Sequence, residues 1–95
     1  MNNKYITPDI VSVKALENYS LYIIFETKEE KIYDMKDLIE KIEFYKKLKD
    51  REYFAKVRPR GETVEWEDGE DVCPENLYNN SISVKDYNGN IQELN

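Results

Sequence analysis

Residues 21–27 read Leu21-Tyr22-Ile23-Ile24-Phe25-Glu26-Thr27, and this stretch decides the fold class. β-Branched and aromatic residues dominate it, which is typical of a β-strand. The alternation places Leu21, Ile23 and Phe25 on one side. We therefore expect a strand that buries one face against a core.

The segments on either side of this strand carry similar patterns. Residues 10–16 follow Thr7-Pro8 and place Val11, Val13 and Ala15 on one face at a period of two. A turn at residues 17–20 joins them to the central strand, and a connection at residues 28–30 leads to a short third strand at residues 31–34. Three consecutive strands with short links predict an antiparallel meander.

The spacing of apolar residues changes after the third strand. Side chains recur at three- and four-residue intervals, with Lys and Glu between them, at Leu38, Ile39, Ile42 and Tyr45. This predicts an amphipathic helix of about two to three turns on the sheet, capped by Asp34 or Asp37. Asp50-Arg51-Glu52 interrupts the apolar pattern, so we expect a break at residues 48–51 and a short second turn.

The rest of the chain predicts two hairpins and a second helix. Residues 55–58 and 63–66 flank Pro59-Arg60-Gly61-Glu62, and residues 81–87 and 91–94 flank Asn88-Gly89-Asn90. Between them, Pro74 opens a short helix at residues 74–78, with Asp71 as a candidate cap. The fold class is therefore α+β, a single small domain over residues 1–95. Its antiparallel sheet combines an N-terminal three-strand meander with later hairpins, and it carries one amphipathic helix and a short second helix.

The composition argues against catalysis. The chain has 95 residues, no His and a single cysteine, Cys73, so Cys–His nucleophiles, internal disulfides and Cys-rich zinc sites are excluded. It contains no Gly-rich phosphate loop. We therefore predict no enzyme activity, no cofactor and no metal site.

The cellular location is predicted from the same features. Residues 1–8 are polar and lack the apolar core of a signal peptide, and the longest apolar run, residues 21–25, is too short to span a bilayer. A lone cysteine and many Lys and Glu residues are typical of a cytoplasmic protein.

The charge of the chain, −6 in total, is unevenly distributed. Residues 41–60 carry 8 basic and 3 acidic side chains, whereas residues 61–95 carry 1 basic and 9 acidic ones. The two segments either neutralise each other within the fold or form two separate binding surfaces.

Two clusters of charged residues are candidate sites. The acidic cluster suits a basic partner protein or a hard cation, although it lacks EF-hand spacing, and its ordinary interpretation is a solvated Gly-containing turn. It comprises Glu65, Glu67, Asp68, Glu70 and Asp71. The basic cluster, with Tyr53 and Phe54 between its members, has the ingredients of a nucleic-acid surface, or it is a solvated helix face over core aromatics. It comprises Arg51, Arg58 and Arg60.

A longer pattern emerges around Trp66. Tyr33-Asp34, Tyr53-Phe54 and, most specifically, Trp66-x-Asp68-Gly69-x-Asp71-Val72-x-Pro74-x-x-Leu77-Tyr78 follow one another in order. The pattern resembles the bacterial domain of unknown function 2442, over about residues 8–78, and it leaves out the C-terminal hairpin at residues 81–94. The resemblance implies a small α+β domain with an antiparallel sheet, and a structural motif formed by Trp66, Gly69, Pro74, Leu77 and Tyr78. It implies no established activity; relatives are suspected of antitoxin-like or accessory roles beside a small partner protein.

Together these observations lead to two functional hypotheses. The first is a cytoplasmic, antitoxin-like accessory module that binds a small basic protein through the acidic cluster. In a second form of this hypothesis, the edge of the C-terminal hairpin adds a strand to a partner or to a second copy in a homodimer. The alternative is weak nucleic-acid binding through residues 41–60, which the net charge disfavours. For Trp66, the options are an anchor for the partner or a core residue.

Overall fold

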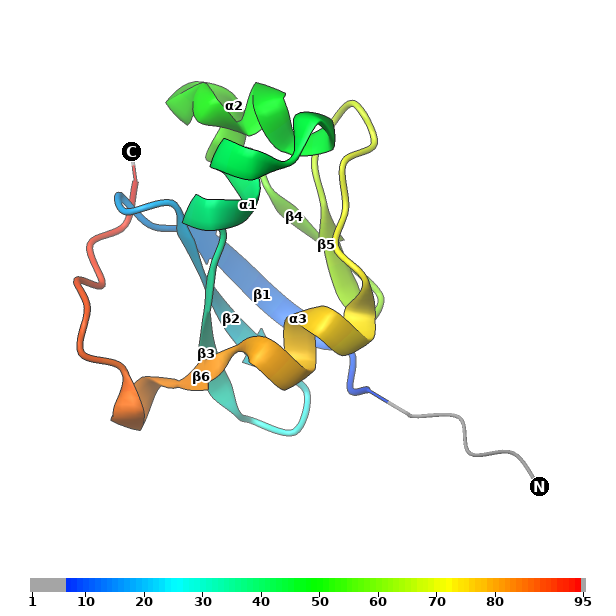
Figure 1. Ribbon diagram of the computed structural model, residues 1–95. Coiled ribbons are helices and arrows are strands. Elements are labelled where there is room, and N and C mark those ends of the chain that lie inside the picture. The colour runs from blue at the N-terminus through cyan, green and yellow to red at the C-terminus, as the bar shows by residue number, and fades with distance from the viewer. Residues whose placement is uncertain (1–6, 95) are drawn as a thin grey trace.

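The main sheet has four strands in the order β1-β2-β3-β6, all antiparallel. The computed structural model describes residues 7–94. The first three strands, β1 (Ile10–Ala15), β2 (Ser20–Phe25) and β3 (Glu30–Asp34), form the predicted meander. The fourth, β6 (Ile82–Ser83), pairs with the free edge of β3. The α+β fold class is confirmed (Figure 1).

The central strand buries the predicted face. Leu21, Ile23 and Phe25 are fully buried, and Val13 and Ala15 pair beside them from β1. The prediction for Val11 is wrong, because a bulge between Ile10 and Ser12 shifts the register. Ile10 takes the inward position instead, and Val11 is left 62% exposed.

The helical layer is broken earlier than the spacing predicts. Helix α1 (Lys36–Lys41) ends before Ile42, which is extended, and the chain continues as a 3₁₀ helix, η1 (Glu43–Lys49). Ile39 and Leu48 are both buried. Nine residues apart in one α-helix they would point in opposite directions, so the turn at Ile42 allows both to reach the core.

The caps also differ in part from the prediction. Met35 precedes α1 without a side-chain cap, while the Asp34 carboxylate accepts the Lys36 N–H at 2.8 Å from just outside the helix. The predicted break at residues 48–51 is confirmed. There Asp50 caps α2 (Arg51–Phe54) by accepting the N–H groups of Glu52 and Tyr53.

A second, two-stranded sheet packs beside β1. Strands β4 (Arg58–Arg60) and β5 (Thr63–Glu65) form a hairpin around Gly61, whose φ of 58° is the left-handed conformation that glycine tolerates. The hairpin starts later than predicted, because residues 55–57 complete the end of α2. Helix α3 (Pro74–Asn80) then crosses in front of the sheet (Figure 1). It begins at Pro74 as expected, but Cys73 rather than Asp71 precedes it.

The predicted C-terminal hairpin is wrong. After β6 the chain forms a short 3₁₀ turn, η2 (Val84–Asp86), and residues 92–94 meet the opposite edge of the sheet, at β1. The Asn-Gly signal is local, whereas its two flanking segments each find a partner elsewhere: Ile82 pairs with Ile32, and Glu93 with Leu16.

No helix within residues 7–94 is long and apolar enough to cross a membrane. The prediction that concerns a leader sequence at the N-terminus falls mostly on residues outside that range.

Candidate functional site

Trp66 is a core residue, as one of the two sequence interpretations has it. Its side chain is fully buried and stacks on Phe54 with ring centroids 5.8 Å apart. The indole N–H donates to the Phe54 carbonyl at 2.9 Å, so the polar atom of the ring is satisfied. Leu77 is buried in the same core, and Gly69, with φ of 102°, closes the loop after Trp66.

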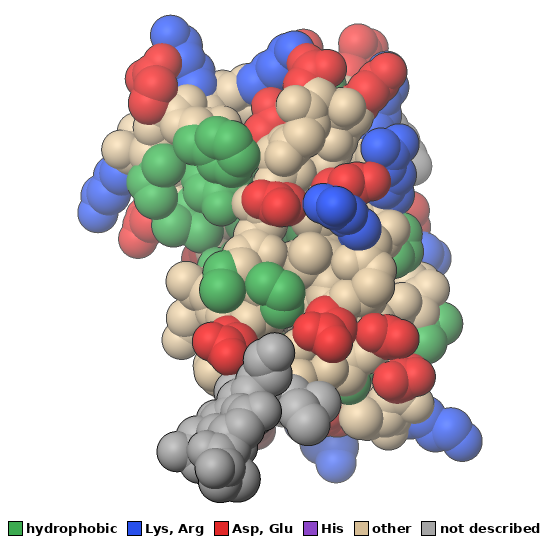
Figure 2. Space-filling model, turned by 90° about the vertical axis from the view of Figure 1, so that its right-hand side faces the viewer, with side chains coloured by type: hydrophobic (Ala, Val, Ile, Leu, Met, Phe, Trp, Pro, Cys, Tyr) green, Lys and Arg blue, Asp and Glu red, His purple; other side chains and the backbone are tan. Residues whose placement is uncertain are grey.

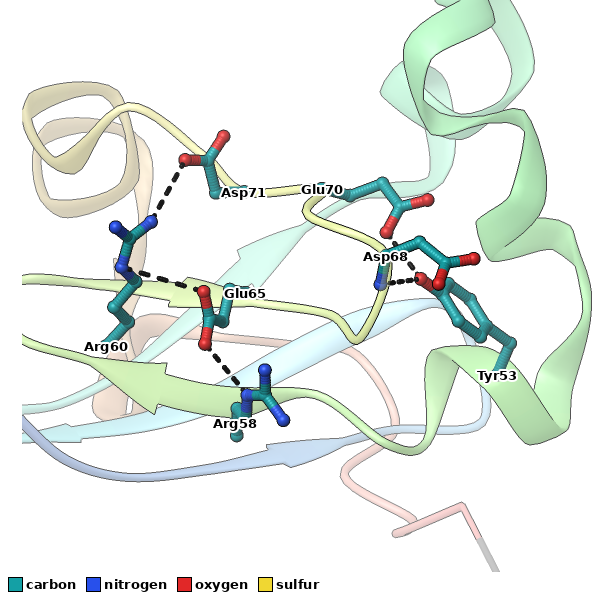
Figure 3. Close-up of polar contacts among 7 residues, drawn as sticks. All are labelled: Tyr53, Arg58, Arg60, Glu65, Asp68, Glu70 and Asp71. Carbon is teal, nitrogen blue, oxygen red and sulfur yellow. Dashed lines mark hydrogen bonds and ion pairs between the residues drawn. The ribbon is translucent and has the colours of Figure 1, made fainter.

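The acidic cluster and the basic segment meet each other in the fold (Figure 3). Glu65 lies between two arginines of the neighbouring strand: its Oε2 is 2.8 Å from Arg58 Nε and its Oε1 is 3.6 Å from Arg60 Nε. Arg60 also reaches Asp71, at 3.9 Å. The β4–β5 hairpin positions these groups, because it places Arg58 directly opposite Glu65.

Two further acids are tied to the helical layer. Asp68 pairs with Lys47 through its carboxylate, and its backbone N–H donates to the Tyr53 hydroxyl at 2.8 Å. That hydroxyl in turn donates to Glu70 Oε1 at 2.6 Å, and Glu70 is only 7% exposed. Burial and the hydrogen bond to the Glu70 carboxylate raise the pKa of Tyr53 to about 12.

Of the remaining predicted site residues, Arg51 is bonded within the fold and Glu67 is not. Arg51 donates to the Glu17 carbonyl at 2.9 Å and lies 5.0 Å from the centre of the Tyr19 ring. Glu67 is exposed and makes no ion pair within residues 7–94. Of the five predicted acids, four are therefore engaged inside the fold, together with all three predicted arginines. Within residues 7–94, no group of three or more acidic or cysteine side chains is arranged to hold a metal ion.

The turn between α1 and η1 is a surface that the sequence interpretation missed. Ile42 is 41% exposed and Phe44 55% exposed, although apolar spacing places Ile42 on the buried face of a helix. Phe44 packs edge-on against Tyr45, whose hydroxyl is anchored on the Asp71 carbonyl at 2.8 Å. On the face that Figure 2 shows, the largest group of apolar side chains lies in the upper half of the molecule, at the height of the helical layer.

Lysines and acids both lie beside these two apolar side chains. Lys41 and Lys49 make no ion pair within the described part of the chain, and Lys46 has only a loose contact with Glu43 at 3.7 Å. A shallow hollow beside Phe44 is lined by Glu43, Lys46, Lys47, Lys49 and Asp50. We call this surface the helical corner: Lys41, Ile42, Phe44, Lys46 and Lys49. A signal for it was present in the sequence, since Phe44 falls outside the three- and four-residue spacing of its neighbours.

Comparison with known proteins places the chain in a family. A family model described as a protein of unknown function, DUF2442, matches residues 10–83. No curated protein and no solved structure matches the chain. The matched residues span the whole of the main sheet, the β4–β5 hairpin and α3. The chain therefore belongs to the DUF2442 family.

Proposed function

We propose that the protein is a cytoplasmic, non-enzymatic accessory module that binds another protein through the helical corner. The observation that carries the proposal is the exposure of Ile42 and Phe44 beside Lys41 and Lys49, which make no ion pair within residues 7–94. Exposed apolar side chains with a polar rim are typical of protein interfaces, and an aromatic residue at the centre supplies most of the binding energy.

The charges around the corner indicate the chemistry of the partner. The acidic cluster is neutralised largely by Arg58, Arg60 and Lys47, so it offers a small basic partner little free charge. Lys41 and Lys49, which make no ion pair within the described residues, instead favour an acidic partner with an apolar pocket for Phe44. An antitoxin-like role fits this arrangement, because such a module acts by covering a surface of its partner.

The test is an affinity purification of the tagged chain from cells that produce it, with nuclease treatment and mass spectrometry. Three forms are compared: the natural chain, the double variant Ile42→Ser/Phe44→Ser, and the control Val11→Ser. Val11 is more exposed than Phe44 and lies on β1, outside the helical corner. We expect one acidic protein in stoichiometric amount with the natural chain and the control, and its loss with the double variant.

Other outcomes would contradict the proposal. A partner that survives Ile42→Ser/Phe44→Ser but is lost in Asp68→Lys/Asp71→Lys would place the interface on the acidic cluster. Recovery of nucleic acid in place of protein at low salt, without nuclease, would support the basic segment as a phosphate-binding surface. Recovery of the chain alone in every case would remove protein binding as its function.

A further inference from the structure

Residues 88–91, which we call the bow, curve out to one side of the main sheet between two attachments to the β1–β2 turn (Figure 1). On one side of the bow, the Tyr87 hydroxyl accepts from Asn18 Nδ2 at 2.8 Å. On the other side, the Gln92 carbonyl accepts the Glu17 N–H at 2.9 Å. Every residue of the bow is exposed, and none belongs to a helix or strand. The bow therefore presents a short stretch of irregular main chain to water.

The bow begins with Asn88-Gly89, and Asn88 is the only asparagine in the sequence that a glycine follows. The side-chain amide of Asn88 thus lies next to a main-chain nitrogen that no Cβ shields. Within residues 7–94, the Gly89 N–H donates no hydrogen bond and the Asn88 side chain makes none. The two groups are therefore free to approach each other without breaking a contact of the fold.

Glycine at position 89 is required by the packing of its neighbour. A Cβ on Gly89 would collide with the Tyr87 hydroxyl and would lie only 2.9 Å from Tyr87 Cε2. Gly89 is not among the glycines with a positive φ, so the close approach of the ring, and not the backbone conformation, excludes a larger residue. The residue that leaves Asn88 reactive is thus the one that the position of Tyr87 demands.

A related pair, Asp68-Gly69, shows how the fold protects such a sequence elsewhere. The Gly69 N–H donates to the Trp66 carbonyl at 3.0 Å, and the Asp68 carboxylate pairs with Lys47. A carboxylate is also less readily attacked than an amide. Both reacting groups are therefore held at Asp68-Gly69, whereas neither is held in the bow.

We propose that Asn88 is a site of spontaneous deamidation, with water as the only co-reactant and independent of the helical corner. The Gly89 nitrogen loses its proton to solvent and attacks Asn88 Cγ. The Cγ–Nδ2 bond breaks, ammonia leaves with a proton from solvent, and a cyclic imide forms. Water then opens the imide at Cγ to give aspartate, or at the main-chain carbonyl carbon to give isoaspartate. Either product adds a negative charge, and isoaspartate also inserts a carbon into the main chain next to Tyr87.

The test incubates the purified full-length chain in mildly alkaline buffer and follows it by isoelectric focusing and peptide mapping. The variants Asn88→Gln and Asn90→Gln are incubated beside it, because Asn90 is also exposed in the bow but is followed by Ile91. We expect a more acidic species with aspartate and isoaspartate at residue 88 in the natural chain and in Asn90→Gln. We expect none at that position in Asn88→Gln. An unmodified Asn88, or equal modification of Asn88 and Asn90, would overturn the proposal.

A synthetic peptide of residues 84–94 supplies the rate of the reaction without the fold. We expect Asn88 in the folded chain to react within about tenfold of the rate in the peptide, because the bow needs no global unfolding to react. A much lower rate in the folded chain, restored to that of the peptide when urea unfolds the protein, would show that the fold protects Asn88. That result would overturn the proposal.

Discussion

The Tyr53 hydroxyl connects the helical layer to the loop after Trp66, because it accepts from Asp68 and donates to Glu70 at the same time. Tyr53→Phe leaves the largely buried Glu70 carboxylate without this donor. We expect the free energy of unfolding to fall by about 1–3 kcal/mol, measured by urea denaturation. Tyr22→Phe is the control, since the Tyr22 hydroxyl also meets a carboxylate, that of Glu30, but at an exposed position. If both variants lost the same free energy of unfolding, the Tyr53 hydrogen bonds would contribute no more to stability than the exposed one of Tyr22.

The raised pKa values of two tyrosines predict how the stability of the protein changes at alkaline pH. Burial raises the pKa of Tyr33 to about 12, and burial with the Glu70 hydrogen bond raises that of Tyr53 to about 12. A raised pKa means that the folded state holds the proton more tightly than the unfolded chain, where the value is about 10. Stability is therefore full below about pH 10 and falls as the pH rises towards 12.

The measurement is the urea midpoint of the natural chain and of Tyr53→Phe at several pH values across that range. We expect the natural chain to lose stability more steeply, since the variant lacks one of the tyrosines whose pKa is raised in the folded state. Parallel curves for both proteins would contradict the assignment to Tyr53.

At the scale of the element, the stability of helix α2 depends on its N-cap more than on its length. The helix has four residues, and the Asp50 carboxylate accepts from Glu52 N–H at 3.0 Å and Tyr53 N–H at 3.4 Å. We expect Asp50→Ala to destabilise the protein by about 1 kcal/mol, measured by thermal or urea unfolding. Asp37→Ala is the control, since Asp37 lies inside the first turn of α1 and makes no cap bond. If Asp50→Ala left the stability unchanged, the packing of Phe54 alone would account for the stability of α2.

The elements that the sequence predicted correctly are those set by local pattern. The meander follows from alternation, and the α3 start from Pro74, because neither depends on distant contacts. The break at Ile42 was not predictable, since it depends on Leu48 also reaching the core. The Asn-Gly turn gave a false hairpin because β3 and β1 compete for the flanking segments.

For the site, sequence reasoning identified opposite charges but not their pairing. That residues 41–60 and 61–95 could neutralise each other was one of two interpretations. Only the hairpin register shows that Arg58 faces Glu65. The helical corner follows from the unpredicted break, because an unbroken helix would have placed Ile42 with Ile39 on its buried side.

For the whole molecule, we expect the helical corner to contribute little to the free energy of unfolding. Its side chains can therefore be replaced without unfolding the protein. We expect Ile42→Ser/Phe44→Ser to change the free energy of unfolding by about 1 kcal/mol or less, because Ile42 is already 41% and Phe44 55% exposed to water. Trp66→Ala, which empties the core, is expected to cost about 3–5 kcal/mol. Urea denaturation of both measures the contrast, and a large loss in the double variant would show that the corner serves the fold.

The position of residues 84–94, which run from the β3 edge of the main sheet to its β1 edge, also bears on aggregation. An open strand edge is a template on which further chains can stack, and proteins protect such edges with short strands or covering segments. Here β6 offers only two residues at one edge, and residues 92–94 cover part of β1 at the other. A protease that cut near Asn88 would free residues 92–94 and uncover this part of β1. We expect molecules cleaved in this way to associate edge to edge more readily than the natural chain.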